Sequence, residues 1–182
     1  MSALFSPIKL RGLKLPNRIM VAPMCQYSAE NGEANDWHFT HINNLALSGA
    51  AMFCIEATHV EATGRITPGC LGLYNDATEA ALKPILASVR RHSKTAVAMQ
   101  LAHAGRKGSS HVPWDGGQQI PLGQGGWQTE APSAVPGHAQ REPGISRFRV
   151  RCYAPPRNDG GYVVDARDGL SPSRNPSRSL RT

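Results

Sequence analysis

The stretch Met52-Phe53-Cys54-Ile55-Glu56-Ala57 decides the fold, because it is short and almost entirely apolar, as strands of parallel sheets are. Two runs of the same character flank it, Arg18-Ile19-Met20-Val21-Ala22 before it and Ala96–Leu101 after it. Between the runs, helical spacing of apolar residues predicts one helix from Asn35-Asp36 through Ser48 and a second over about residues 76–93. The order strand, helix, strand, helix, strand predicts an α/β fold with a parallel sheet.

Local signals place the remaining elements. Ile8–Leu10 and Leu13–Leu15 flank Arg11-Gly12 and predict a hairpin at the start of the chain. Asp76-Ala77-Thr78-Glu79 has the spacing of a capping box, which predicts the start of the second helix. Pro84 fits that helix only if its first turn begins late. The apolar positions that mark the two helical faces are Phe39, Ile42, Leu45 and Ala46 in the first, and Leu82, Ile85, Leu86 and Val89 in the second.

Residues whose side chains can take part in binding or catalysis follow each predicted strand. In parallel α/β folds the functional loops lie beyond the carboxyl ends of the strands. The first strand leads into Pro23-Met24-Cys25-Gln26-Tyr27-Ser28, and the second into Thr58-His59-Val60 and then Gly64–Gly69. The third ends in Gln100-Leu101-Ala102-His103-Ala104-Gly105-Arg106-Lys107. We therefore expect a functional site where these three segments meet.

Together with Pro16-Asn17-Arg18 and Ala131-Pro132-Ser133-Ala134, these segments resemble the Old Yellow Enzyme family of FMN-dependent ene-reductases. The resemblance is to the xenobiotic-reductase-like branch, which carries a cysteine after the first strand, and it runs from Ser2 to about Pro136. It implies the N-terminal part of a TIM (β/α)8 barrel that begins with a β-hairpin. It also implies FMN as cofactor, NADPH or NADH as reductant, and hydride transfer to α,β-unsaturated carbonyls or similar small-molecule acceptors.

The resemblance assigns roles to individual residues. Cys25 and Tyr27 become catalytic: the thiol tunes the flavin and contacts substrate, and the phenol polarises a substrate carbonyl. Gln100 becomes a partner for the pyrimidine edge of the flavin, since an amide offers both a donor and an acceptor. Each has a plainer alternative: an ordinary buried thiol, a boundary tyrosine and a water-bonded glutamine. The implied cofactor-binding residues are Ala22, Pro23, Met24, Cys25, Ala57 and Gln100.

Other chemically interesting residues have plainer interpretations. His38 and His41 lie three apart, and we interpret them as a helix-surface pair; we expect no metal site. His103 and Arg106 either line the site or bond within their own loop. Trp37, Trp114 and Trp127 pack in loops or form substrate walls, and the sequence does not choose.

Charge divides the chain near residue 137. The whole chain of 182 residues carries +7, but residues 1–136 hold eleven basic against nine acidic side chains. Residues 137–182 hold nine Arg and no Lys against four acids, in a segment rich in Gly, Pro and Ser. Such a segment predicts disorder, apart from one strand-like run at Gly161–Val164. Aromatic residues are not regularly interleaved with the arginines for stacking on bases, so the pattern does not favour a nucleic-acid partner.

We therefore expect two regions, residues 2–136 as a partial FMN-binding barrel and residues 137–182 as a disordered basic tail. No His-x-x-His or His-x-x-Asn pair, which the family uses to grip the substrate oxygen, occurs beyond His138. Our hypothesis is a frameshift near residue 137; a genuine truncation with a new tail is the competing explanation. An inactive fragment that binds flavin weakly or not at all is the alternative function.

The remaining expectations concern location and assembly. No secretory signal or membrane-length apolar run is visible, and the four cysteines form no Cys-x-x-Cys pair. These features predict a reducing, cytoplasmic setting without a membrane partner. The unpaired edges of a three-stranded parallel sheet predict a homo-oligomer or aggregation.

Overall fold

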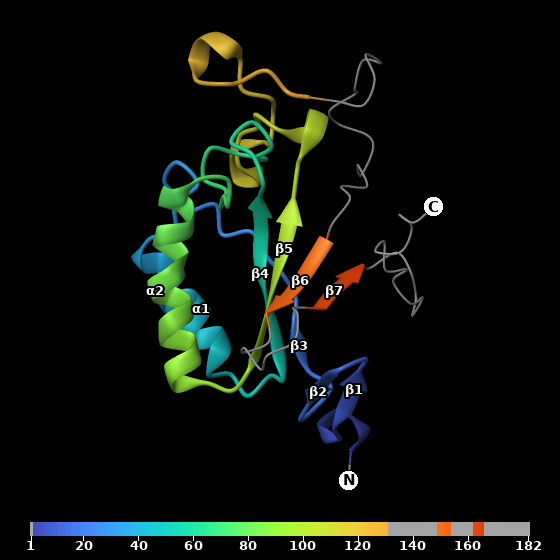
Figure 1. Cartoon of the computed structure of the whole chain (residues 1–182). Coiled ribbons are helices and arrows are strands. Elements are labelled where there is room, and N and C mark those ends of the chain that lie inside the picture. Colours follow the sequence, from blue (N-terminus) through green and yellow to red (C-terminus); the bar gives the residue numbers. More distant parts are fainter. Residues whose placement is uncertain (1, 131–148, 154–161, 166–182) are drawn as a thin grey trace, which may run out of the picture.

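The computed structural model describes residues 2–130 and two further strands, and it is built around one mixed sheet (Figure 1). The strands are β1 (Ile8–Leu10), β2 (Leu13–Leu15), β3 (Met20–Val21), β4 (Met52–His59), β5 (Ala96–Ala102), β6 (Arg149–Tyr153) and β7 (Tyr162–Asp165). The α-helices are α1 (Asp36–Ala46) and α2 (Asp76–His92). The short 3-10 helices are η1 (Ala3–Phe5), η2 (Gly105–Lys107), η3 (Pro113–Asp115) and η4 (Leu122–Gln124).

The sheet has the order β3-β4-β5-β6-β7. β3, β4 and β5 are parallel neighbours, which confirms the strand–helix–strand–helix–strand interpretation of the sequence. β1 and β2 pair separately as the predicted antiparallel hairpin, with Ile8 opposite Leu15. β3 is shorter than expected, and β4 continues two residues further to His59.

Two strands fall within the segment 137–182 that we expected to be disordered apart from the strand-like run Gly161–Val164. β6 pairs antiparallel with β5, and β7 pairs antiparallel with β6 and contains most of the strand-like run Gly161–Val164. The described sheet therefore has five strands, and the edge of β5 that we expected to be open is paired. The rest of this segment, together with the motif Ala131–Ala134, lies outside the described residues.

Both helices lie on one side of β4 and β5 (Figure 1). α1 begins at the N-cap Asn35 and α2 at Asn75, whose side chain accepts the Thr78 N–H at 2.8 Å. The predicted capping box is therefore displaced by one residue, because Asn75 and not Asp76 occupies the cap. Pro84 lies well inside α2, so our expectation of a late first turn is wrong.

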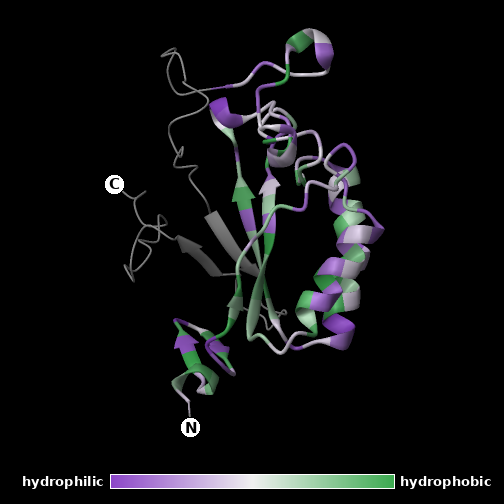
Figure 2. Ribbon diagram, turned by 180° about the vertical axis from the view of Figure 1, so that it is seen from behind, coloured by the Kyte–Doolittle hydropathy of each residue, from purple (hydrophilic) through white to green (hydrophobic). Residues whose placement is uncertain are grey.

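The strands bury two different clusters on their two faces. Figure 2 shows the hydrophobic colouring of the central strands. Phe53, Ile55 and Met99 pack against the helices, together with Ile42, Ala46, Leu82, Ile85 and Val89. Met52, Cys54 and Ala98 face the other way and pack against Leu15 of the hairpin. Successive strand residues alternate between faces, so the hairpin covers the side of the sheet that the helices leave open. None of the described helices is long and apolar enough to cross a membrane.

Candidate active site

A β-bulge in β4 decides which side chains face each other at the carboxyl end of the sheet. Ile55 is paired with Met99, but the next pair is Ala57 with Gln100, so Glu56 is an extra residue without a partner in β5. Since Ala98 belongs to the hairpin-side cluster, alternation places Gln100 on that same face. The bulge therefore brings Ala57, rather than Glu56, beside Gln100. Two residues that we assigned to cofactor binding are thus direct neighbours.

Cys25 reaches this pair from the segment that follows β3. Its thiol is within hydrogen-bonding reach of the Ala57 backbone and of the Tyr27 side chain. Burial, followed by the nearby Cys70 and Glu56, raises the pKa of Cys25 to about 11. Burial first, and then Cys25, raises the pKa of Tyr27 to about 12. At neutral pH the site therefore presents a protonated thiol beside a protonated phenol.

Tyr27 is held in an unusual backbone conformation. Its φ is +54°, in the left-handed region that costs a non-glycine residue about 1–2 kcal/mol. The loop before α2 packs closely on it, since a Cβ atom added at Gly69 would lie 2.5 Å from the Tyr27 carbonyl oxygen. Ala29 N–H also donates to Gly69 C=O at 2.9 Å, and the Tyr27 ring meets Trp114 edge to face at 5.5 Å. Surrounding contacts thus fix this strained turn.

The carboxamide of Gln100 fits the role of a ligand contact. It is half-buried, and among residues 2–130 no side chain or backbone group forms a hydrogen bond with it. A half-buried amide without partners retains its donors and acceptor for a bound group. Ala57 beside it is buried and small. These two residues fit the edge of a planar, polar heterocycle such as FMN.

The chain that leads to Cys25 leaves apolar side chains uncovered. Met24 is 56 % exposed, Ala22 is exposed and Pro23 is half-buried. Gln26 side-chain Nε2 donates to Met24 C=O at 2.9 Å and orders this stretch from within. The segment is therefore an extended, accessible strip beside Cys25.

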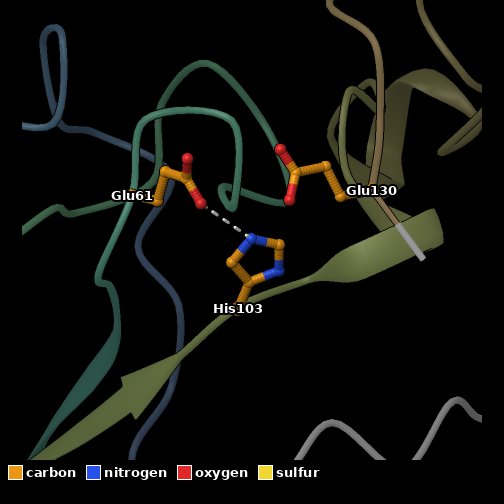
Figure 3. Close-up of side chains that lie close together, drawn as sticks. All are labelled: Glu61, His103 and Glu130. Carbon is orange, nitrogen blue, oxygen red and sulfur yellow. Dashed lines mark hydrogen bonds and ion pairs between the residues drawn. The ribbon is translucent and has the colours of Figure 1, made fainter. Parts of the chain in front are cut away.

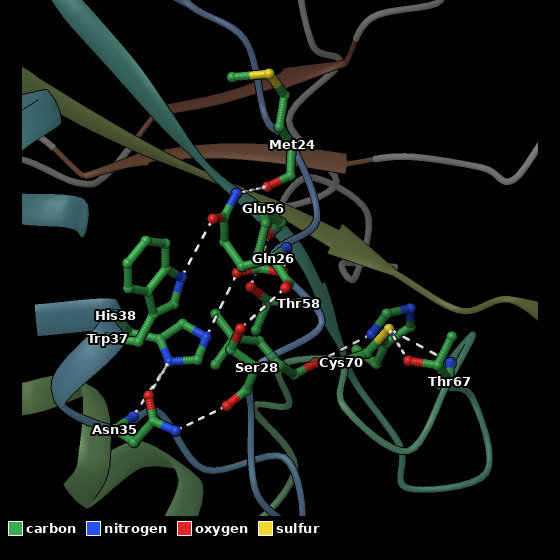
Figure 4. A network of polar contacts seen from close by, with 12 residues as sticks. Met24, Gln26, Ser28, Asn35, Trp37, His38, Glu56, Thr58, Thr67 and Cys70 are labelled. Carbon is green, nitrogen blue, oxygen red and sulfur yellow. Dashed lines mark hydrogen bonds and ion pairs between the residues drawn. The ribbon is translucent and has the colours of Figure 1, made fainter. Parts of the chain in front are cut away.

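His38 does not lie on the helix surface as we expected. Its ring is 1 % exposed, and Nε2 lies 3.5 Å from Oε1 of the buried Glu56 (Figure 4). The helical face of α1 therefore includes His38 in place of Phe39, which is 43 % exposed. His41 does lie near the surface, where its ring stacks on Trp37 with centroids 5.9 Å apart.

Sequence reasoning missed Glu56 as a site residue. Its Oε2 accepts the Gln26 N–H at 2.8 Å, directly between Cys25 and Tyr27 in the chain. The available signal was a single charge inside an otherwise apolar strand, because such a charge stays buried only when it is partnered.

His103 forms one hydrogen bond within its own loop, as one of the two interpretations left open for it predicts, and it also contacts Glu61 of the loop after β4. Figure 3 shows it between Glu61 and Glu130, whose ligand atoms lie within 4.8 Å of one another and of the ring. His103 Nδ1 accepts the Gly105 N–H at 3.1 Å, which leaves the proton on Nε2, 3.3 Å from Glu61. A ring nitrogen that carries a proton cannot ligate a metal. The geometry therefore favours a structural role for His103, which holds the loop by hydrogen bonds.

The loop after β5 forms a separate surface. Trp127 Nε1 donates to Thr63 C=O at 2.8 Å, and the Arg65 guanidinium lies 5.3 Å above the Trp127 ring. Trp127 thus packs in the loop, whereas Trp114 packs on Tyr27 and is 70 % exposed. An open hollow of about 300 Å³ lies between residues 119–122 and 127–129, and none of the predicted site residues lines it.

Comparisons with known proteins show the family to which the chain belongs. A family model described as the NADH:flavin oxidoreductase / NADH oxidase family matches residues 3–141. The chain is 39% identical over 158 residues to the NADH:flavin oxidoreductase FG08077 of Gibberella zeae, covering 85% of this chain and 38% of that protein. It is 47% identical over 109 residues to an NADPH dehydrogenase of Listeria monocytogenes, covering 59% and 32%.

The fold agrees as well. The old yellow enzyme from Trypanosoma cruzi superimposes with a TM-score of 0.58 and 26% identity, over 78% of this chain and 37% of that one. The alignment with the Gibberella protein covers enough of the chain to pass residue 136, where we expected the resemblance to end. The chain thus spans about a third of the length of these relatives, and its α/β sheet corresponds to a fragment of their TIM barrel. With three quarters of its length matched to the family model, the chain belongs to the NADH:flavin oxidoreductase / NADH oxidase family, which includes the Old Yellow Enzymes.

Proposed function

We propose that this chain carries the flavin-facing opening segment of an NAD(P)H-dependent ene-reductase. In this proposal residues 2–136 are a partial FMN-binding barrel, and the basic segment 137–182 that follows adds β6 and β7 to the edge of its sheet. Bound FMN would supply the hydride chemistry between NADPH or NADH and an α,β-unsaturated carbonyl, which no amino-acid side chain can provide. The reductant and the acceptor are small molecules.

The observation that carries the proposal is the pairing of Ala57 with Gln100, with Cys25 in contact with Ala57. Two neighbouring strands, β4 and β5, and the segment that follows β3 thereby contribute to one patch. The unpartnered Gln100 carboxamide would donate to and accept from the alternating polar edge of the flavin pyrimidine. Ala22, Pro23, Met24 and Cys25 would lie along the ring, where the exposed strip beside Cys25 provides apolar contact.

Cys25 and Tyr27 would act on the substrate side. Because the pKa of Tyr27 is raised to about 12, its phenol keeps its proton at neutral pH and can donate a hydrogen bond to a substrate carbonyl oxygen. That bond withdraws electron density from the conjugated alkene and favours hydride attack at the β-carbon. Cys25 stays a neutral thiol for the same reason, so it offers polarisable contact without adding negative charge.

The test uses the full chain with FMN, NADPH and 2-cyclohexen-1-one under anaerobic conditions. Quenching of flavin fluorescence reports binding, and loss of NADPH absorbance that requires the enone reports turnover. Tyr27→Phe should slow enone-dependent oxidation by about 10- to 100-fold, the range for removing one positioned donor. Tyr74→Phe is the matched control, since the Tyr74 hydroxyl only donates to Asn31 C=O at 2.7 Å. Neither quenching nor turnover in the wild-type chain would favour the inactive-fragment alternative and overturn the proposal.

A further inference from the structure

The buried carboxylate of Glu56 links three elements that otherwise meet only at the site. It belongs to the bulge of β4, its side chain is 4% exposed, and its two oxygens face different partners (Figure 4). Oε2 accepts the backbone N–H of Gln26 at 2.8 Å. Oε1 lies 3.5 Å from Nε2 of His38 in α1. A buried carboxylate is thus placed on the backbone of the turn that carries Cys25 and Tyr27.

His38 is oriented to support this carboxylate. Its Nδ1 contacts Asn35, with the Asn35 N–H at 3.2 Å and Oδ1 at 2.8 Å. Nε2 must carry a proton, because a bare lone pair facing a carboxylate would repel it. Nε2 forms no hydrogen bond among the described residues, so its polar contact there is the 3.5 Å ion-pair contact with Oε1 of Glu56. The His38 ring is therefore held between Asn35 and Glu56, with Nε2 directed at the carboxylate.

The same turn is anchored again on its far side. Asn35 Nδ2 donates to Ser28 C=O at 2.7 Å, and Trp37 Nε1 donates to Gln26 Oε1 at 3.2 Å. Between the Gln26 and Ser28 anchors lies Tyr27 with its φ of +54°. A strained residue persists only when its surroundings over-determine it. Of these anchors, Glu56 is the one that accepts a hydrogen bond from the backbone between Cys25 and Tyr27.

We propose that Glu56, supported by His38, is the positioning residue that holds Cys25 and Tyr27 together by accepting the Gln26 N–H. It touches neither substrate nor flavin and acts through the turn. The inference rests on the proposed function for its consequence in catalysis, but its geometry does not depend on flavin. Removing the acceptor should let the turn open and expose the Cys25 thiol, while the sheet below stays closed.

The experiment measures the alkylation rate of each cysteine by iodoacetamide at pH 8, resolved by peptide mass spectrometry. Cys54, which is 2% exposed in β4, serves as the internal reporter of general loosening. Glu56→Ala should raise the Cys25 rate about tenfold or more, the factor that losing one charge-assisted hydrogen bond implies, and the Cys54 rate less than about twofold. Glu56→Asp keeps the charge but is one methylene shorter, so it should behave like Glu56→Ala.

Glu56→Gln is the rescue, because its amide oxygen still accepts the Gln26 N–H. It should leave the Cys25 rate within about threefold of wild type, a small rise being expected because the carboxylate charge that helps to raise the Cys25 pKa is gone. Ile55→Ala changes a neighbouring buried residue on the helix side, and it should not selectively raise the alkylation rate of Cys25. Equal rises at Cys25 and Cys54, an unchanged Cys25 rate in Glu56→Ala and Glu56→Asp, or failure of Glu56→Gln to rescue would each overturn the inference. Because this assay needs no FMN, its failure is distinguishable from failure of the proposed function.

Discussion

The two faces of the parallel sheet are built in different ways. On the helix side, large apolar side chains such as Phe53, Ile55 and Val89 are at most 3% exposed and pack into one continuous cluster. On the opposite side, the hairpin packs on a smaller cluster that includes Met52, Cys54 and Ala98, and beyond them lie the small Ala57 and the half-buried Gln100. We infer from this difference that the helix side supplies the folding stability, while the carboxyl end of the other face can hold residues for binding and catalysis. The predictions below test this division.

Phe53→Ala should give the largest effect. Phe53 is 0% exposed at the centre of the helix-side cluster, and truncating such a ring costs about 3–5 kcal/mol of unfolding free energy. Phe39→Ala is the matched control, since Phe39 is 43% exposed and should cost much less. Urea unfolding followed by circular dichroism measures both. Equal losses in the two variants would contradict the assignment of the core to this face.

This core was predictable from the sequence. The apolar runs and their lengths predicted β3, β4 and β5, and the spacing of Leu82, Ile85 and Val89 predicted the buried face of α2. These signals are local, because a strand or helix buries its own repeating positions. The hairpin was predicted in full for the same reason.

The details of the site were harder to predict from the sequence. Whether Glu56 is an extra residue depends on the register of β5, which lies some forty residues further along the chain. His38 is buried because the bulge sends a carboxylate toward α1, and no periodicity of α1 alone indicates that. The family resemblance predicted that Cys25, Ala57 and Gln100 lie close together. The structure also places these three residues near one another. Their roles in flavin binding stay predictions.

Gly69→Ala should give the next largest effect, this time at the boundary between the two faces. The added Cβ would lie 2.5 Å from the Tyr27 carbonyl oxygen, so backbone must shift, at a cost of about 1–3 kcal/mol. Gly123→Ala is the control, because a Cβ there meets nothing within 4 Å. Thermal unfolding measures stability, and Cys25 alkylation reports whether the turn has opened. A Gly69→Ala protein as stable as the control would show that the loop does not brace Tyr27.

Pro84→Ala should stabilise the helix side by about 1 kcal/mol. Pro84 lies inside α2 and has no N–H to donate to the carbonyl of Ala80, so alanine restores that bond. Part of the gain is offset because alanine gives the unfolded chain more freedom than proline. The midpoint of urea unfolding should rise. A fall would mean that the helix depends on a bend at this position.

High pH should weaken the turn side more gently. The folded state raises the pKa of Cys25 from 9.0 to about 11 and that of Tyr27 from 10.0 to about 12. Both groups are neutral when protonated, so their contribution to stability is complete below pH 9 and is lost as the pH rises through 9 to 11 and 10 to 12. The difference in unfolding midpoint between wild type and Cys25→Ser should therefore change between pH 8 and pH 10.5. A constant difference would place Cys25 in a solvated setting.

Gln100→Ala should have the smallest effect on stability and yet the most specific one on binding. Its carboxamide forms no hydrogen bond within residues 2–130, so removing it breaks no hydrogen bond there and should change the unfolding free energy by less than about 0.5 kcal/mol. The same change removes the donor and acceptor that we assign to the flavin edge, so FMN should bind about tenfold or more weakly by fluorescence quenching. Gln124→Ala, in the exposed η4, should leave both quantities unchanged. A Gln100→Ala protein that loses stability but keeps its FMN affinity would reverse the division between the two faces, since Gln100 would then belong to the packing rather than to the chemistry.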